Sequence, residues 1–250
     1  MMDGLGDPGA WVVFLLVAFG AEVIGTVAGF GAATILTPVA ALFLDVKTAI
    51  AIVAVFHLFG NASRLIFFGR WIHWTAWRLF VASGIVCSFA GAAVAATLSS
   101  AVVKLCLGAF LVAYVAASAV SPRPPQLPRR SLLLAGGASS GFVAGLIGTG
   151  GAIRSACLLS FGLSADAYLG TSAAIALLVD ATRLPVYVRS GFMSSQLLPL
   201  LSVLLVVAFA GSWVGQRVVH RMSPVWFRRG VWTMLTLIGL KLLVDGWRGV

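Results

Sequence analysis

Three ionisable side chains interrupt stretches of the sequence that are otherwise apolar. Arg154 comes three residues after a glycine cluster, Glu22 comes one to two helical turns before another, and His57 lies within an apolar run. A charge in such a stretch is costly unless it faces the protein interior or water, and it often marks a transport path or a proton relay. Arg154 is therefore a candidate for binding an anion, the alternative being a structural salt bridge.

Glu22 and His57 are candidates for carrying protons. The alternative for Glu22 is an ion pair with Arg154 or Arg64, and the alternative for His57 is an ordinary hydrogen bond. Either residue, if it is a proton carrier, would couple transport to a proton gradient.

A second polar motif occurs twice along the chain. Asp180 and Arg183 are spaced i, i+3, which places them on one face of a helix where they can form an ion pair. Their counterparts, Asn61 and Arg64, keep the arginine but have an amide in place of the acid. Two interpretations remain: the four residues contribute to substrate binding, or the arginines, near helix ends, extend to the membrane surface.

Two glycine clusters give the strongest indication of a binding site. They comprise Gly29, Phe30, Gly31, Ala32 and Ala33, and then Gly148, Thr149, Gly150, Gly151 and Ala152. Glycine permits backbone angles that other residues avoid and exposes its amide groups. A short apolar stretch follows each cluster, so the positive dipole end of a short helix would point at it. Two such ends meeting near the middle of a membrane would form an anion site. The alternative is close helix packing through small residues.

The stretches that must position these residues are typical of a membrane protein. Of the 250 residues, 60% are hydrophobic and 10% are charged, whereas a soluble domain carries about 25% charged residues. The exterior must therefore face lipid. Apolar stretches cover approximately residues 11–28, 32–44, 49–68, 77–98, 101–120, 132–147, 152–163, 168–188, 197–219 and 225–246. The stretches 32–44 and 152–163 are too short to cross a core of about 30 Å, because helical residues rise about 1.5 Å each.

The chain divides into two related halves. The shift that superposes Gly29 on Gly148 superposes, without a gap, the polar motif around Arg64 on that around Arg183. A segment rich in proline and arginine separates the halves. We therefore predict three parts, namely a first membrane repeat, a Pro/Arg linker and a second membrane repeat, over residues 1–120, 121–130 and 131–250.

The distribution of charge predicts how the halves are oriented. The net charge is +10, and the basic residues lie mostly in short loops, as the positive-inside rule predicts. If each glycine cluster is the tip of a helical hairpin, each half has five segments, so the second half enters the membrane upside down. The loops 69–76, 121–130 and 220–224 then lie inside the cell and the acidic N-terminus lies outside. We predict an all-α polytopic membrane protein of two inverted repeats of about five segments, each with a glycine-tipped helical hairpin.

No motif of a soluble enzyme is present. The sequence has no P-loop, HExxH, GxSxG or dinucleotide fingerprint, and its three cysteines lack metal-ligand spacing. We therefore predict no catalytic residue, no metal and no cofactor. No basic stripe with interleaved aromatic residues indicates a nucleic-acid partner. The expected partners are a small anionic substrate and the lipid bilayer of the cell inner (plasma) membrane, and a homo-oligomer is compatible with this prediction.

The glycine motifs also resemble those of a known family. Gly29–Pro38, Gly148–Ala152 and Gly170–Ser172 are similar to motifs of the sulfite exporter TauE/SafE family of membrane permeases, and the resemblance covers nearly the whole chain. Ala32 and Ala33 stand where the first motif prefers glycine, and Cys157 occupies the place of Pro38 in the second half. The resemblance implies transport of small sulfur-containing anions such as sulfite, thiosulfate or organosulfonates.

These observations together predict a secondary transporter, an exporter of a small anion such as sulfite or an organosulfur anion, that works by alternating access about the two hairpin tips. The two glycine clusters and Arg154 would bind the anion. One alternative is a permease for another small organic acid. The other is an intramembrane scaffold without transport, which would have no reason to keep two chain breaks flanked by polar groups.

Overall fold

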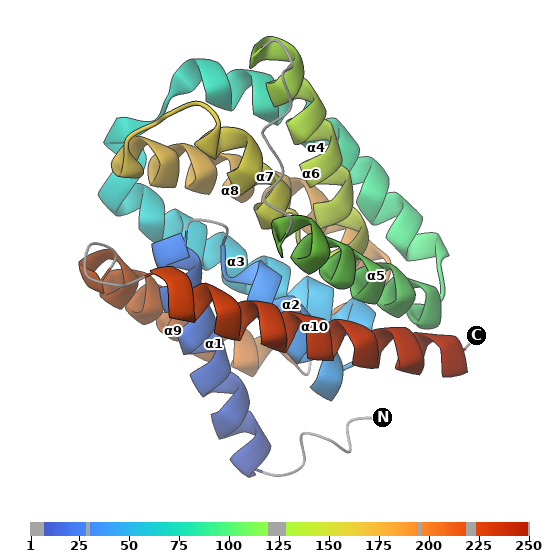
Figure 1. The fold of residues 1–250 in the computed structure, drawn as a ribbon. Coiled ribbons are helices and arrows are strands. Elements are labelled where there is room, and N and C mark those ends of the chain that lie inside the picture. The colour runs from blue at the N-terminus through green and yellow to red at the C-terminus, as the bar shows by residue number, and fades with distance from the viewer. Residues whose placement is uncertain (1–7, 29–30, 120–128, 195–196, 219–223, 250) are drawn as a thin grey trace.

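The computed structural model describes residues 8–28, 31–119, 129–194, 197–218 and 224–249, and within them the chain forms ten α-helices and one 3-10 turn, with no strand (Figure 1). The helices of the first half are α1 (Pro8–Ala28), α2 (Ala33–Phe43), α3 (Val46–Phe68), α4 (Trp74–Thr97) and α5 (Ser100–Ala119), with the turn η1 (Gly69–Trp71) after α3. Those of the second half are α6 (Arg129–Ile147), α7 (Gly151–Leu159), α8 (Ala165–Arg189), α9 (Leu198–Val218) and α10 (Pro224–Arg248). The predicted all-helical fold is confirmed.

The lengths of the helices fit a membrane protein. Among the described residues, six helices are long and apolar enough to cross a membrane, namely α3 with η1, α4, α5, α6, α8 and α9. By contrast, α2 has 11 residues and α7 has 9, which at 1.5 Å per residue give about 16 Å and about 14 Å, roughly half of a membrane core. The two predicted short helices are therefore present.

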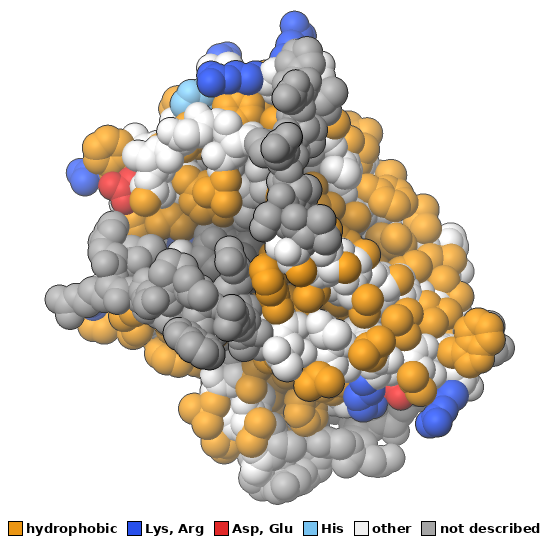
Figure 2. All heavy atoms as spheres, in the orientation of Figure 1, with side chains coloured by type: hydrophobic (Ala, Val, Ile, Leu, Met, Phe, Trp, Pro, Cys, Tyr) orange, Lys and Arg blue, Asp and Glu red, His pale blue; other side chains and the backbone are white. Residues whose placement is uncertain are grey.

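The outer surface is largely hydrophobic. Figure 2 shows hydrophobic side chains covering the flank of the visible face, with most of its basic side chains near the upper and lower edges. Exposed large apolar side chains occur on helices from both halves, for example Val86, Phe89, Val206 and Leu237. This surface is suited to contact with lipid.

The long helices α3 and α8 form the centre of the molecule. They pack against each other. In the most apolar 18-residue segment of each helix, 67% is buried in α3 and 61% in α8, against 22% in α5. The start of each is fixed by a side-chain cap, because Asp45 accepts a hydrogen bond from the Lys47 amide at 2.9 Å and Ser164 accepts one from the Ala167 amide at 3.3 Å. The two caps occupy equivalent places in the two halves. In Figure 1 α5 and α10, which pack together, lie across the outside.

Small residues allow close contact between the halves. A Cβ atom at Gly137, Gly141 or Gly145 of α6 would clash with a backbone carbonyl oxygen of α4. These glycines are spaced by four residues, the pattern that lets two membrane helices approach closely. On the other side of the molecule α9 packs against α1, where a Cβ at Gly211 or Gly215 would lie 2.7 Å from the side chains of Glu22 and Thr26. Close contacts of this kind join the first helix of each half, α1 or α6, to a long helix of the other half.

Candidate functional site

The two hairpin tips lie together inside the molecule. Thr149 at the second tip donates a hydrogen bond from its hydroxyl to that of Thr34 in the first turn of α2, at 3.0 Å, and both residues are buried. Gly31 has a φ of 85° and Gly148 a φ of 82°, a region that favours glycine strongly. The predicted need for glycine at the tips therefore has a backbone cause. The first two residues of the first cluster, Gly29 and Phe30, lie outside the described residues.

The tips are not identical. The alignment of the halves pairs Gly31 with Gly150, yet Gly150 has a φ of −130° and the left-handed residue of the second tip is Gly148. Gly150 is required for a different reason, since a Cβ there would clash with the carbonyl oxygen of Ser140. The other cluster residues, Ala32, Ala33, Gly151 and Ala152, are buried at the starts of α2 and α7.

Arg154 lies in the first turn of α7, as predicted. Its amide donates to the Gly150 carbonyl at 3.1 Å, and its Nε donates to the Ser172 hydroxyl of α8 at 2.9 Å. The residue is only 3% exposed, and within the described part of the chain its Nη2 has no hydrogen-bond partner and no carboxylate forms a salt bridge with it. A buried guanidinium of this kind can offer N–H donors and an uncompensated positive charge to an anion.

Glu22 and Arg64 form one of two buried ion pairs. Arg64 Nη2 donates to Glu22 Oε1, and Arg64 also donates to Thr26 at 3.0 Å and to the side chain of Asn61 at 2.8 Å. The Ser212 hydroxyl of α9 donates to the same Glu22 oxygen at 2.7 Å. Of the alternatives that the sequence left for Glu22, the structure therefore contains the ion pair with Arg64.

Asp180 and Arg183 form the second buried ion pair, as their spacing predicts. Arg183 donates to Asp180 Oδ1 from Nε at 3.0 Å and from Nη2 at 2.6 Å. The other carboxylate oxygen of Asp180 is 2.8 Å from His57 Nδ1 of α3. Arg64 and Arg183 are 4% and 1% exposed, so the interpretation that they extend to the membrane surface is wrong. Both lie well inside a packed helix pair.

Each of the two ion pairs neutralises one of the repeated arginines, but the acid comes from a different place in each half. In the first half the acid is Glu22 on α1, and the equivalent place on α6 is Gly141. In the second half the acid is Asp180 on α8, and the equivalent place on α3 is Asn61. Each repeated arginine thus has one carboxylate partner, which lies on α1 in the first half and on α8 in the second. Each arginine also links its own helix to the first helix of its half, since Arg64 contacts Glu22 of α1 and Arg183 donates to the Ala144 carbonyl of α6. Each arginine is thereby neutralised by a carboxylate, and a contribution of these residues to substrate binding stays a prediction.

His57 connects this charged cluster to the first hairpin tip. Its Nδ1 contacts Asp180, while its Nε2 is buried without a hydrogen-bond partner in the described part of the chain. A Cβ at Gly31 would clash with that Nε2 atom, so the free ring nitrogen lies directly against the tip. Arg154 is within electrostatic range of both His57 and Asp180. The structure therefore brings together most of the residues that the sequence singled out.

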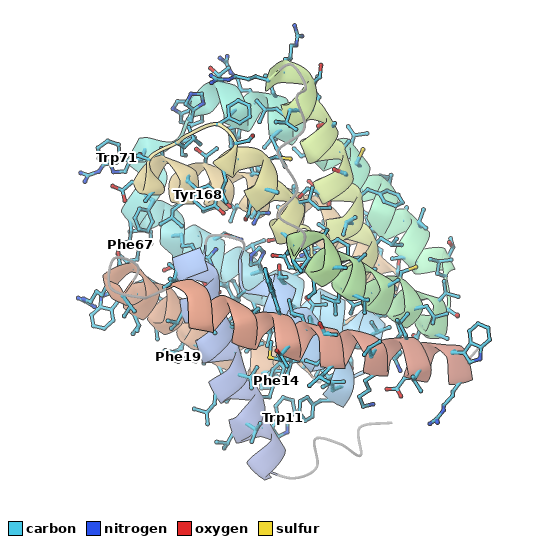
Figure 3. The ribbon with its side chains drawn as sticks, viewed as in Figure 1. Trp11, Phe14, Phe19, Phe67, Trp71 and Tyr168 are labelled. Carbon is cyan, nitrogen blue, oxygen red and sulfur yellow. The ribbon has the colours of Figure 1, made fainter. Side chains whose placement is uncertain are left out.

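Several polar partners in this region were not predicted. Ser172, Ser212, Thr26 and Tyr187 accept or donate hydrogen bonds within the cluster, and Tyr168, labelled in Figure 3, donates to Ser155 at 2.7 Å. Serine and threonine are common in membrane helices as packing residues, so their type alone gave no signal. The two serines and Thr26 could have been selected only by knowing which helix faces lie opposite the arginines.

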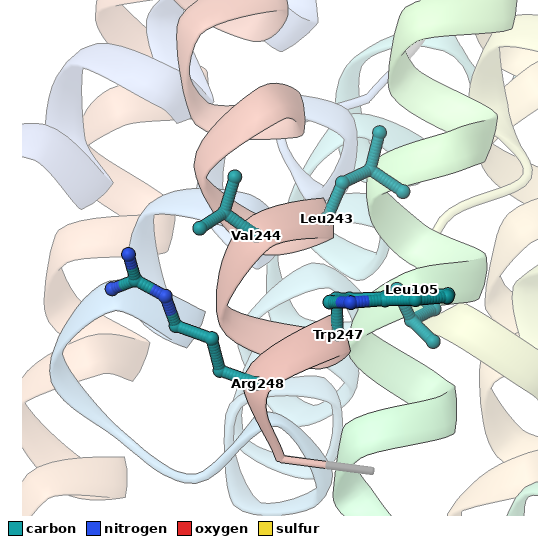
Figure 4. A pocket seen from close by; sticks show the side chains of 5 residues that line it. All are labelled: Leu105, Leu243, Val244, Trp247 and Arg248. Atoms are coloured by element: carbon teal, nitrogen blue, oxygen red, sulfur yellow. The ribbon is translucent and has the colours of Figure 1, made fainter.

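A pocket of about 340 Å³ lies elsewhere, between the C-terminal part of α10 and α5 (Figure 4). It is lined by Leu105, Leu243, Val244, Trp247 and Arg248. None of these residues belongs to the buried charged cluster, and all come from helices at the outside of the molecule. We assign no role in the candidate site to this pocket.

Comparison with known proteins identifies the family of the chain. No curated protein and no solved structure matches the chain. The family model described as "Sulfite exporter TauE/SafE" matches residues 14–242, a range that contains both hairpin tips, both ion pairs, His57 and Arg154. By this match the chain belongs to the sulfite exporter TauE/SafE family, a family of membrane transporters.

Proposed function

We propose that this protein is a secondary transporter of a small oxyanion, an exporter of sulfite or a related organosulfur anion, and that Arg154 and the two hairpin tips bind the anion. The observation that carries the proposal is the charge of Arg154. The described buried side chains include three arginines, namely Arg64, Arg154 and Arg183, and two carboxylates, Glu22 and Asp180. Because each of these carboxylates is paired with another arginine, Arg154 carries one excess positive charge among the described buried groups.

An unpaired buried charge is costly, so a protein retains one only where a ligand or water neutralises it. The position of Arg154 favours a ligand. It lies in the first turn of α7, where free backbone N–H groups and the helix dipole already favour negative charge. Its Nη2, which has no hydrogen-bond partner among the residues that the structure describes, adds a charged side-chain donor to those of the helix terminus. An oxyanion accepts hydrogen bonds at two oxygens, which suits the planar guanidinium better than a lysine ammonium.

The arrangement of the helices supports alternating access by two inverted repeats over residues 1–120 and 131–250, joined by the linker 121–130. Each of the main contacts between the halves has an equivalent with the halves interchanged. Helix α4 packs on α6 and α8, and its equivalent α9 packs on α1 and α3, the equivalents of α6 and α8. The equivalent pairs α3 with α8 and α5 with α10 pack on each other. A two-fold relation between the halves would produce this pattern. Rocking of one half against the other would then expose the hairpin tips to each side of the membrane in turn.

The test is uptake of radiolabelled anions by purified protein in liposomes. A panel of sulfite, thiosulfate, methanesulfonate and acetate, run with and without a pH gradient, identifies the class of substrate. We expect uptake of the sulfur oxyanions to be lost in Arg154→Gln and kept in Arg189→Gln, which removes an exposed arginine from the end of α8. Uptake of acetate alone would favour the permease for other organic acids, and no uptake of any anion would favour the scaffold.

A further inference from the structure

We infer that His57 is the proton-binding group of the anion site, and that it takes up one proton when a divalent anion binds and none when a monovalent anion binds. This inference rests on the proposed function and deepens it. It follows from three features: the charge balance of the buried cluster, the position of the His57 ring, and the commitment of the other titratable groups to ion pairs.

The charge balance sets what the site can hold. With His57 neutral, the described buried groups carry one excess positive charge, on Arg154. A monovalent anion brings the site to neutrality. A divalent anion leaves one uncompensated negative charge, which is unfavourable in a poorly solvated interior. One proton added to a neighbouring base restores neutrality, so a divalent anion and a proton are expected to bind together.

His57 has the geometry of that base. Asp180 holds Nδ1 at 2.8 Å, which places the ring proton on Nδ1 and leaves the lone pair on Nε2. Nε2 is buried, has no partner in the described part of the chain, and lies against Gly31 at the first hairpin tip. Protonation there creates a second N–H donor beside the tip. The contact with Asp180 also joins α3 of one half to α8 of the other, so the proton would be held where the halves meet.

The other groups near His57 are less suited to bind this proton. On α3 Arg64 is paired, and on α8 Asp180 and Arg183 are paired with each other. Glu22 of α1 has an Oε2 atom without a hydrogen-bond partner among the described residues, but protonation of Glu22 would leave Arg64 without a carboxylate. The remaining charged groups on α3 and on the helices packed against it lie at exposed or partly exposed positions. They are Lys47 on α3, Arg70, Lys104, Asp166, Arg189 and Arg217, and α2 carries none.

The experiment is calorimetric titration of the full-length purified protein in buffers of different ionisation enthalpy, which counts protons taken up per anion bound. The probes are thiosulfate, which is divalent, and methanesulfonate, which is monovalent. Over a range from about pH 6 to about pH 9, which brackets the titration of histidine, we expect uptake on thiosulfate binding to rise to about one proton at the alkaline end. The affinity for thiosulfate should there fall about tenfold per pH unit, as linkage to one proton requires.

For methanesulfonate we expect no proton uptake at the alkaline end. His57→Gln, which retains a donor for Asp180, should bind thiosulfate more weakly and without proton uptake. Equal uptake for the two anions, or none for either while both bind, would overturn the inference and leave the proposed function standing. Uptake that persists in His57→Gln would assign the proton to Glu22 and would also overturn it. Failure of both anions to bind the wild-type protein would instead contradict the proposed function.

Discussion

Replacing Glu22 with glutamine should destabilise the protein strongly, because it would leave Arg64 charged and buried without a carboxylate. The side chains of Arg64 and Glu22 are 5% and 0% exposed, and Glu22 Oε1 accepts from both Arg64 and Ser212. Breaking a buried pair by removing one partner costs about 3–5 kcal/mol. We expect Glu22→Gln to lower the free energy of unfolding by about that amount.

The same reasoning predicts partial rescue by a second substitution. In Glu22→Gln/Arg64→Gln no unpaired charge remains at this position, so the double variant should be more stable than Glu22→Gln by at least about 1 kcal/mol. The assay is unfolding by SDS in mixed micelles. The matched control is Asp245→Asn, which breaks the pair with Lys241, whose side chains are 57% exposed for lysine and 34% for aspartate. An exposed pair of this kind contributes about 0–1 kcal/mol.

The reasoning would be refuted if Glu22→Gln changed the free energy of unfolding no more than Asp245→Asn does. It would also be refuted if the double variant were less stable than Glu22→Gln, since the cost would then arise from lost packing and not from charge.

Three further predictions concern the tips, the helix packing and the topology. Gly31→Ala should abolish transport, since its Cβ would clash with His57 Nε2. Gly162→Ala, also at positive φ but with no described atom within 4 Å of its Cβ, should retain transport, and equal transport in both variants would contradict a role for the first tip. Gly141→Ala should reduce stability by forcing α6 away from the Gly84 carbonyl of α4, while Gly20→Ala, whose Cβ would meet no atom of the described residues within 4 Å, should not. In intact cells a single cysteine at position 3 should react with an impermeant label and one at position 126 should not, and labelling of both would contradict the inverted arrangement.

Much of the fold follows from local features of the sequence. Glycine, proline and charged residues separate the apolar runs, so the helices and the two short segments could be predicted from length and composition. The Asp180–Arg183 pair could be predicted because its two members are three residues apart on one helix. The N-caps Asp45 and Ser164 likewise precede their helices directly.

Contacts between distant residues could not be predicted in this way. His57 and Asp180 are 123 residues apart, and only the packing of α3 on α8 brings them together. The interpretation that Arg64 extends to the membrane surface was wrong. It relied on the distance of Arg64 from a helix end along the sequence, which does not show which face of the helix is covered by neighbouring helices. The left-handed residue of the second tip is Gly148, although the repeat pairs Gly150 with Gly31, because the path of each tip depends on its own neighbours.

The central claim, that Arg154 binds a small oxyanion, is tested most directly by the Kd for thiosulfate of the wild-type protein, Arg154→Gln, Arg154→Lys and Arg189→Gln. Loss of a charge-assisted hydrogen bond costs about 1.5–3 kcal/mol, which raises Kd roughly 10- to 150-fold. We expect that increase in Arg154→Gln, a smaller one in Arg154→Lys, which keeps the charge but loses the planar fork, and none in Arg189→Gln. Because Arg154→Gln removes an uncompensated buried charge, the empty variant should be at least as stable as the wild type. Unchanged affinity together with lowered stability in Arg154→Gln would contradict the account and make Arg154 a structural residue.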